Sequence, residues 1–195
     1  MFHFKILYVH GLGSSSQSST AQQLKTHLPS VLDDSFELFS PDIPELPSIA
    51  IPFIESFVHN NSIDLVIGSS LGGFKVLNSK FSTHVNVLVI NPVIDFNATQ
   101  IETSQSLVEL YNEGITIFEK YKANHLIHPQ SKKKVVFIGL SDEVLDSNKQ
   151  LEALNAYYLS NGTNSELIEL PNEGHKLSED TIRLVVCPVI ATILL

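Results

Sequence analysis

The sequence predicts an α/β fold in which helices cover both faces of a mostly parallel sheet of six strands. Short apolar runs rich in β-branched residues alternate with longer amphipathic segments along nearly the whole chain. One of these runs passes into a helical segment through Gly68-Ser69-Ser70-Leu71-Gly72, a pattern typical of a sharp strand-to-helix turn. Because 195 residues are enough to bury a core, we expect one domain that spans residues 1–195.

The strands are expected where apolar runs of strand length are bounded by turn-forming residues. The first run lies almost at the start of the chain, and the third ends at the glycine-rich turn. The six predicted strands cover residues 4–9, 36–40, 65–67, 85–90, 135–138 and 166–170. Parallel strands are joined by crossovers, so the loops that follow them should share the carboxyl edge of the sheet, where ligands bind in such folds.

The helices are expected between these strands, over residues 17–28, 48–60, 71–80 and 144–160, with a last one from residue 178 onward. Ser48 can cap the second helix, which carries Pro52 within its first turns. Pro188 should disturb the last helix because proline cannot donate a backbone hydrogen bond.

The interval between the fourth and fifth predicted strands is longer than a simple crossover needs. Residues recur in it at helical spacing: Leu107, Leu110, Tyr111, Gly114, Phe118 and Tyr121. Two interpretations stay open. Residues 92–133 form a small helical insertion that caps a functional site, or they contain a crossover helix packed on the sheet, which carries the same apolar stripe.

Composition and charge narrow the function classes. The chain is 43% apolar and 17% charged, which is ordinary for a globular protein. Its net charge of −9 disfavours nucleic acid or an anionic membrane as the main partner. Lys132-Lys133-Lys134 directly precedes the fifth strand, so we expect a solvated strand entrance at the edge opposite the site. Lys75 lies one turn into the helix after the glycine-rich turn; an outward orientation is one interpretation, and we assign it no role in the site.

The remaining compositional features concern compartment and redox state. The single cysteine, Cys187, excludes an intramolecular disulfide and lies in an apolar stretch typical of a buried small residue. The first residues lead directly into a predicted strand and lack the pattern of a cleavable leader. The apolar tail, residues 184–195, is too short to span a bilayer. We therefore expect a cytoplasmic protein without a membrane span.

Ser70 is the candidate nucleophile. It is the serine at the centre of a G-x-S-x-G motif, whereas Ser69 lacks the flanking glycines. Gly68 and Gly72 are needed because Cβ atoms there would collide with the neighbouring strand and helix. A serine on such a turn presents its hydroxyl above the carboxyl edge of the sheet.

Candidate oxyanion donors follow from the same geometry. Acyl transfer needs preorganised N–H groups for the tetrahedral intermediate, and we expect them from Leu71 and from Leu12, in the loop after the first strand. The glycines at 11 and 13 give that loop the freedom to aim an N–H inward. A phosphate-binding loop is the competing interpretation, although Ser16 replaces the third glycine of G-x-G-x-x-G.

A base and an orienting acid follow the last two strands. His175, after the sixth strand, can take the proton of Ser70, although a loop histidine is commonly only solvated. Asp142, after the fifth strand, can accept the Nδ1 hydrogen of a histidine, or it can simply cap the next helix. Glu143 and Asp146 are substitutes from the same turn. The order Ser70, Asp142, His175 favours a hydrolase site.

The other histidines lack such a placement. His125 and His128 have a spacing that suits weak metal binding, but no carboxylate or cysteine completes a set. His10 is expected to order its own loop. We therefore expect no metal site.

With these motifs, the chain resembles the α/β-hydrolases and is more closely similar to the small esterase family related to YqiA. The matching segments lie in family order along nearly the full length: Ile6-Leu7-Tyr8-Val9-His10-Gly11, Ile67-Gly68-Ser69-Ser70-Leu71-Gly72-Gly73-Phe74, Val89-Ile90-Asn91-Pro92, Gly139-Leu140-Ser141-Asp142-Glu143-Val144-Leu145-Asp146 and Gly174-His175. Lys176-Leu177 departs from the expected family pattern, which affects the pocket wall beside the histidine.

The resemblance implies a reduced α/β-hydrolase fold with strand order 2-1-3-4-5-6. It implies Ser70 as nucleophile, Asp142 as orienting acid and His175 as base, acting on a small-molecule ester or thioester without a cofactor. The leading hypothesis is therefore a serine esterase or thioesterase that forms an acyl-enzyme. A non-catalytic binding module and an amide hydrolase or peptidase are the alternatives. No oligomeric state is indicated.

Overall fold

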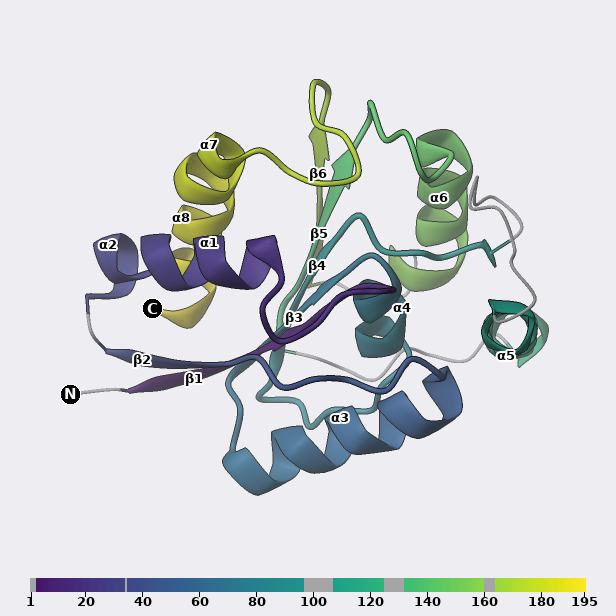
Figure 1. Ribbon diagram of the computed structural model, residues 1–195, viewed down its shortest axis with the longest axis horizontal. Coiled ribbons are helices and arrows are strands. Elements are labelled where there is room, and N and C mark those ends of the chain that lie inside the picture. The colour runs from purple at the N-terminus through teal and green to yellow at the C-terminus, as the bar shows by residue number, and fades with distance from the viewer. Residues whose placement is uncertain (1–2, 34, 97–106, 125–131, 160–163) are drawn as a thin grey trace.

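The computed structural model describes residues 3–33, 35–96, 107–124, 132–159 and 164–195. Within them lies one sheet of six strands, every neighbouring pair parallel, in the predicted order β2-β1-β3-β4-β5-β6 (Figure 1). The strands are β1 (Phe4–Val9), β2 (Phe36–Phe39), β3 (Leu65–Ser69), β4 (Asn86–Ile90), β5 (Lys134–Gly139) and β6 (Ser165–Leu170).

Helices cover both faces of this sheet (Figure 1). One face is packed by α1 (Ser19–His27), α2 (Pro29–Leu32) and the C-terminal α7 (Glu179–Thr181), η4 (Ile182–Val186) and α8 (Cys187–Leu194). The other is packed by α3 (Pro47–Asn61), α4 (Leu71–Leu77), α6 (Ser147–Ala153) and η3 (Leu154–Leu159). The remaining helix, α5 (Val108–Asn124), lies against α3. This is the doubly wound arrangement that the alternating pattern predicts.

The strand side chains divide between two cores. In β1, Leu7 and Val9 pack with α3 and α4, whereas Ile6 and Tyr8 pack with α1 and α8. The two faces are both apolar because successive strand residues point to opposite sides and both sides are covered. The carboxyl ends of the strands consequently meet at one edge, where the following loops carry polar side chains.

Two helix details differ from the expectation, and a third agrees with it. Ser48 lies inside α3 rather than at its cap, because Leu46 is the capping position and Pro47 the first helical residue. The predicted 144–160 helix begins only at Ser147, with Asp146 as its cap. As expected, the last helix is disturbed near Pro188: it forms the π-helical turn η4 before the proline, which accommodates the missing N–H without ending the helix.

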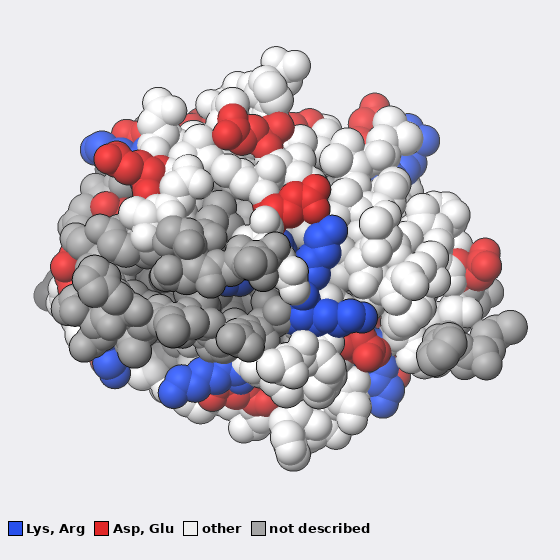
Figure 2. Space-filling view, turned by 180° about the vertical axis from the view of Figure 1, so that it is seen from behind, with Lys and Arg blue, Asp and Glu red and all other residues white. Residues whose placement is uncertain are grey.

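The basic run also differs from the expectation of a solvated strand entrance. β5 begins at Lys134, whose residue surface is only 7% exposed, and burial lowers the pKa of this lysine to about 8. Lys133 remains partly exposed and lies 3.0 Å from a carboxylate oxygen of Glu166. On the described part of the face in Figure 2, basic side chains lie next to acidic ones.

Two further observations concern the remaining compositional predictions. Cys187 is fully buried, and burial raises the pKa of its thiol to about 11. Among the described residues, no helix combines the length and the apolar character needed to cross a membrane.

Candidate active site

Ser70 lies at the junction between β3 and α4 with an unusual backbone conformation. Its φ is 53° and its ψ is −123°, a region that a residue with a side chain rarely adopts. Neighbouring glycines make the close packing around it feasible. A Cβ at Gly68 would lie 2.7 Å from the carbonyl oxygen of Gly72, and one at Gly72 would lie 2.3 Å from the carbonyl oxygen of Val9. The strand and helix therefore approach as closely as the motif predicts.

Three side chains from three different loops form one hydrogen-bonded chain. Ser70 Oγ lies 2.9 Å from His175 Nε2, and His175 Nδ1 lies 2.8 Å from Asp142 Oδ2. The side chain of Asp142 is 3% exposed and that of His175 19%, so the acid is screened from water while the imidazole remains accessible. An ionised carboxylate can only accept, so Nδ1 carries the hydrogen and Nε2 faces the serine hydroxyl as an acceptor.

Asp142 is the acid among the three candidates that contacts the imidazole. Its second oxygen, Oδ1, accepts the N–H groups of Val144 and Leu145, each at 2.8 Å, so the same carboxylate also closes the following turn. Asp142 therefore closes a turn before α6, whereas the cap of that helix is Asp146. Glu143 and Asp146 instead accept hydrogen bonds from backbone N–H groups. Glu143 Oε2 accepts the backbone N–H of His175 at 3.1 Å, and Asp146 Oδ1 accepts an N–H in the first turn of α6.

The loop after β1 lies against Ser70. A Cβ at Gly11 would lie 3.0 Å from Ser70 Cβ, so a larger residue there would crowd the serine. Leu12 follows directly and packs against the same apolar cluster as Leu71, which opens α4. The two residues predicted as oxyanion donors therefore lie in the segments that flank the serine.

His10 anchors this loop through both ring nitrogens. Nε2 accepts the backbone N–H of Ile43 at 2.9 Å, so Nδ1 carries the hydrogen and donates to the carbonyl of Gly11, also at 2.9 Å. The ring is 2% exposed. His10 thus ties the loop to the segment that follows β2.

Two carboxylates from that segment accept further N–H groups of the loop. Glu45 Oε1 accepts the N–H of Gly13 at 3.0 Å, and Asp42 Oδ1 accepts that of Ser16 at 2.7 Å. The hydrogen bonds from Ser16 hold the pKa of Asp42 below its usual value. Because carboxylates already occupy these donors and would repel an anion, the geometry argues against a phosphate-binding loop.

Lys75 is buried instead of pointing outward. Its Nζ donates to the carbonyl of Pro44 at 2.8 Å and lies 3.8 Å from Glu45 Oε2. Burial lowers the pKa of this lysine to about 8, and the charge of Glu45 partly opposes that change. Lys75 thereby links α4 to the segment that holds the loop after β1. No local pattern predicts this link, because it joins residues about 30 positions apart in the chain.

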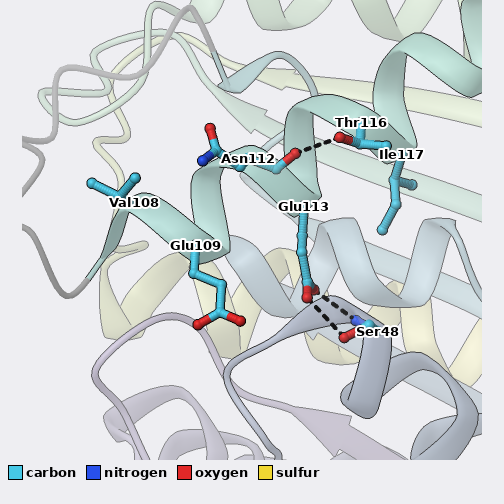
Figure 3. Close-up of a pocket in the computed structure, with 7 residues that line it drawn as sticks. All are labelled: Ser48, Val108, Glu109, Asn112, Glu113, Thr116 and Ile117. Carbon is cyan, nitrogen blue, oxygen red and sulfur yellow. Dashed lines mark hydrogen bonds between the residues drawn. The ribbon is translucent and has the colours of Figure 1, made fainter.

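Beside the site, α5 packs on an apolar cluster. Leu110 and Tyr111 contact a group that includes Leu71 and Phe96, and the rings of Tyr111 and Phe96 meet edge to face with centroids 5.5 Å apart. On another side of α5, a groove of about 880 Å³ separates this helix from the start of α3 (Figure 3). Its described lining residues are Ser48, Val108, Glu109, Asn112, Glu113, Thr116 and Ile117.

Figure 3 shows how α5 is joined to α3 across this groove. The carboxylate of Glu113 points toward Ser48 and accepts both its backbone N–H, at 3.0 Å, and its hydroxyl, at 2.9 Å. A carboxylate at a helix N-terminus satisfies free N–H groups and opposes the positive end of the helix dipole. Glu113 thus supplies the cap that Ser48 was expected to provide.

Metal ligands do not gather in the part of the chain that the structure describes, since no group of three or more histidine, cysteine, aspartate or glutamate side chains could hold an ion there. His125 and His128 lie outside the described residues.

The architecture is that of the α/β-hydrolase fold, as comparison with solved structures shows. The chain superposes on a monoacylglycerol lipase of Paleococcus ferrophilus with a TM-score of 0.70 at 13% identity, covering 99% of this chain and 96% of the lipase. For a soluble variant of monoglyceride lipase from Saccharomyces cerevisiae, the TM-score is 0.72 at 15% identity, with 99% and 86% covered. An esterase domain from Rhodothermus marinus gives 0.64 at 14% identity, with 97% and 85% covered.

The sequence itself places the chain within a narrower group. Residues 5–175 match the family described as "Uncharacterised protein family (UPF0227)", and the chain belongs to that family. This match and the shared fold confirm the resemblance to the α/β-hydrolases and to the family related to YqiA.

Proposed function

We propose that this protein is a serine esterase or thioesterase that hydrolyses a small carboxylic ester through an acyl-enzyme intermediate. The observation that carries the proposal is the hydrogen-bonded chain from Ser70 through His175 to Asp142. Such a chain lets a neutral imidazole accept the serine proton while the carboxylate stabilises the imidazolium that results. Esterases and lipases among the structures of the same fold support this class of reaction.

The reaction follows from the roles of these groups. Ser70 Oγ attacks the substrate carbonyl, and its proton moves to His175 Nε2. The N–H groups of Leu12 and Leu71 hold the oxyanion, aided by the positive end of α4. The intermediate collapses as Nε2 protonates the leaving alcohol or thiol. Water, deprotonated by the same nitrogen, then attacks the acyl-enzyme, and Nε2 returns that proton to Ser70 Oγ as the acid leaves.

We also propose that the 92–133 insertion acts as a cap beside the acyl site. Support comes from α5: its Leu110 belongs to the apolar cluster that contains Leu71, and its Tyr111 packs against that cluster, as Leu12 does. A cap built on the oxyanion segments would present apolar surface to an acyl chain and help to exclude water from the acyl-enzyme.

Two neighbouring serines offer a direct test. Ser70→Ala removes the nucleophile, whereas Ser69→Ala removes a hydroxyl that hydrogen-bonds to Tyr8 at 2.8 Å. With activated short-chain esters, we expect Ser70→Ala to lower kcat by about 10⁶, or to the background rate, by analogy with comparable triads. Ser69→Ala should retain the activity within about threefold, because that hydroxyl lies outside the proposed proton path.

Labelling with a fluorophosphonate probe separates the alternatives. The proposal requires labelling of the wild type and of Ser69→Ala but not of Ser70→Ala. An unlabelled wild type would instead indicate a binding module on a hydrolase fold. Faster hydrolysis of matched amides than of esters would indicate an amide hydrolase.

A further inference from the structure

Asn91 occupies an unusual position directly after β4. Its φ is 43°, and the residue is 2% exposed. Its amide makes three hydrogen bonds to backbone groups at the end of β5 and in the loop that carries His175. Oδ1 accepts the N–H of Gly139 at 2.6 Å, while Nδ2 donates to the carbonyls of Gly174 and His175, at 2.9 and 2.8 Å.

The partners determine the orientation of this amide. An N–H must face an acceptor and carbonyls must face donors, so Oδ1 points toward β5 and Nδ2 toward the histidine loop. Few side chains meet both demands at this length. Asparagine also tolerates the positive φ better than most residues with a Cβ. The amide is buried, so water cannot substitute for it.

The end of β4 also forms a hydrogen bond with the backbone of Ser70, the proposed nucleophile. The carbonyl of Ile90 accepts the backbone N–H of Ser70 at 3.0 Å, and the N–H of Asn91 donates to the carbonyl of Phe137 at 2.8 Å. Two consecutive residues thus bind the backbones of Ser70 and of His175. Below the histidine loop, a Cβ at Gly139 would lie 2.5 Å from the carbonyl oxygen of Glu173, so this loop rests directly on the end of β5.

We propose that Asn91 is a positioning residue that sets the distance between His175 and Ser70. The inference rests on the proposed esterase function of the same site. Glu143 also holds the histidine backbone, but its residue is exposed to water, which weakens a single hydrogen bond. Asn91 is the buried residue that connects the histidine loop to β4, the strand whose end accepts the backbone N–H of Ser70. Because a misplacement of about 1 Å can cost about 10²-fold in rate, loss of this amide should reduce the chemical step.

Asn86 provides a matched control for the test. It opens β4 at the opposite edge of the sheet, is 3% exposed, and also donates from Nδ2 to a backbone carbonyl, that of Asp64, at 3.3 Å. Asn91→Asp and Asn86→Asp each exchange a buried amide for a carboxyl of the same size. In Asn91→Asp, an acceptor for Gly139 remains, but both donors to the histidine loop are lost.

The measurements are steady-state kinetics with an activated short-chain ester, the rate of fluorophosphonate labelling, and the thermal unfolding midpoint. We expect Asn91→Asp to lower kcat and the labelling rate by about 10- to 100-fold, with KM within about threefold, since the ester site itself is retained. Asn86→Asp should remain within about twofold per folded molecule, although both variants lower the midpoint. If Asn91→Asp does not fold, Asn91→Gly, which accepts the positive φ, takes its place.

Equal labelling rates for the two variants would overturn the positioning role and leave the esterase proposal intact. A wild type that is not labelled at all would overturn both. A selective loss in Asn91→Asp or Asn91→Gly, with labelled wild type and unchanged KM, supports the inference.

Discussion

At the scale of single residues, the site depends on a strained serine that its neighbours hold in place. A left-handed, non-glycine conformation such as that of Ser70 costs about 1–3 kcal/mol and persists only when surrounding contacts over-determine it. Here the N–H of Ser70 donates to Ile90, while its carbonyl accepts the N–H groups of Phe74 and Val93. The backbone bonds therefore direct the hydroxyl toward His175.

A first prediction at this scale concerns which carboxylate, that of Asp142 or that of Asp146, orients the imidazole of His175. Asp142→Asn removes the acceptor that keeps the hydrogen on Nδ1, so we expect kcat to fall by about 10³–10⁴ through the wrong tautomer. Asp146→Asn, in the same turn, keeps a good helix cap and should change kcat by less than about threefold. Ester hydrolysis at saturating substrate measures both. A larger loss of kcat in Asp146→Asn than in Asp142→Asn would indicate that Asp146 is the acid that orients His175.

At the scale of elements, the junction of β3 and α4 depends on close backbone contact. A Cβ at Gly68 would meet the backbone of Gly72 and Gly73 at 2.7–2.9 Å, so no side-chain movement could relieve it. The spacing of these glycines is a local feature that predicts the contact. By contrast, the brace formed by Lys75 and Glu45 is absent from any local pattern, because α4 meets the segment after β2 only in the folded chain.

Gly68→Ala tests the contact at this junction. We expect the free energy of unfolding to fall by about 3 kcal/mol, because α4 must move away from β3. Gly13→Ala is the control: its Cβ would meet no atom within 4 Å, and only its φ of +62° is unfavourable, at about 1–2 kcal/mol. Chemical denaturation compares them, and a Gly68→Ala variant as stable as Gly13→Ala would contradict the close approach.

At the scale of the whole molecule, two lysines are buried on different elements. Lys75 lies in α4, whereas Lys134 opens β5, and burial lowers the pKa of each to about 8 from an ordinary value of 10.5. As the pH rises, such a lysine loses its proton at a lower pH in the folded chain than in the unfolded chain. Between pH 8 and 10.5, the unfolded chain therefore binds more protons, and the free energy of unfolding rises with pH.

Lys134→Met tests this pH dependence. Burying the charged amine costs about 3 kcal/mol at pH 7, so the variant should be more stable there by an amount of up to that size. Between pH 7 and 9.5, the wild type should gain about 2 kcal/mol more than the variant does. Lys133→Met removes a partly exposed ion pair and should change stability by less than about 1 kcal/mol. Urea unfolding at both pH values measures this; identical slopes for wild type and Lys134→Met would contradict it.

Much of the fold could be predicted because its determinants are local. Each central strand is a continuous apolar run, and the strand order follows the resemblance carried by motifs along the chain. Helix ends were less predictable. Ser48 has the chemistry of a cap, but Pro47 already occupies the first helical position and Glu113 comes from a helix more than 60 residues away. The sequence predicts that Lys134 belongs to a solvated basic run, but strand pairing buries this residue.

The sequence by itself determined the alternation of strands and helices, the serine between its glycines, and the order in which an acid and a histidine follow later strands. Those features depend on neighbours in the chain. Tertiary structure decided that Asp142 contacts the imidazole of His175 whereas Glu143 accepts its backbone N–H, that Lys75 turns inward, and that Asn91 joins the end of β5 and the histidine loop to β4. The physical reason is that loop side chains take their direction from hydrogen bonds across 30 to 85 positions of sequence, which exist only once the sheet has brought the loops to one edge.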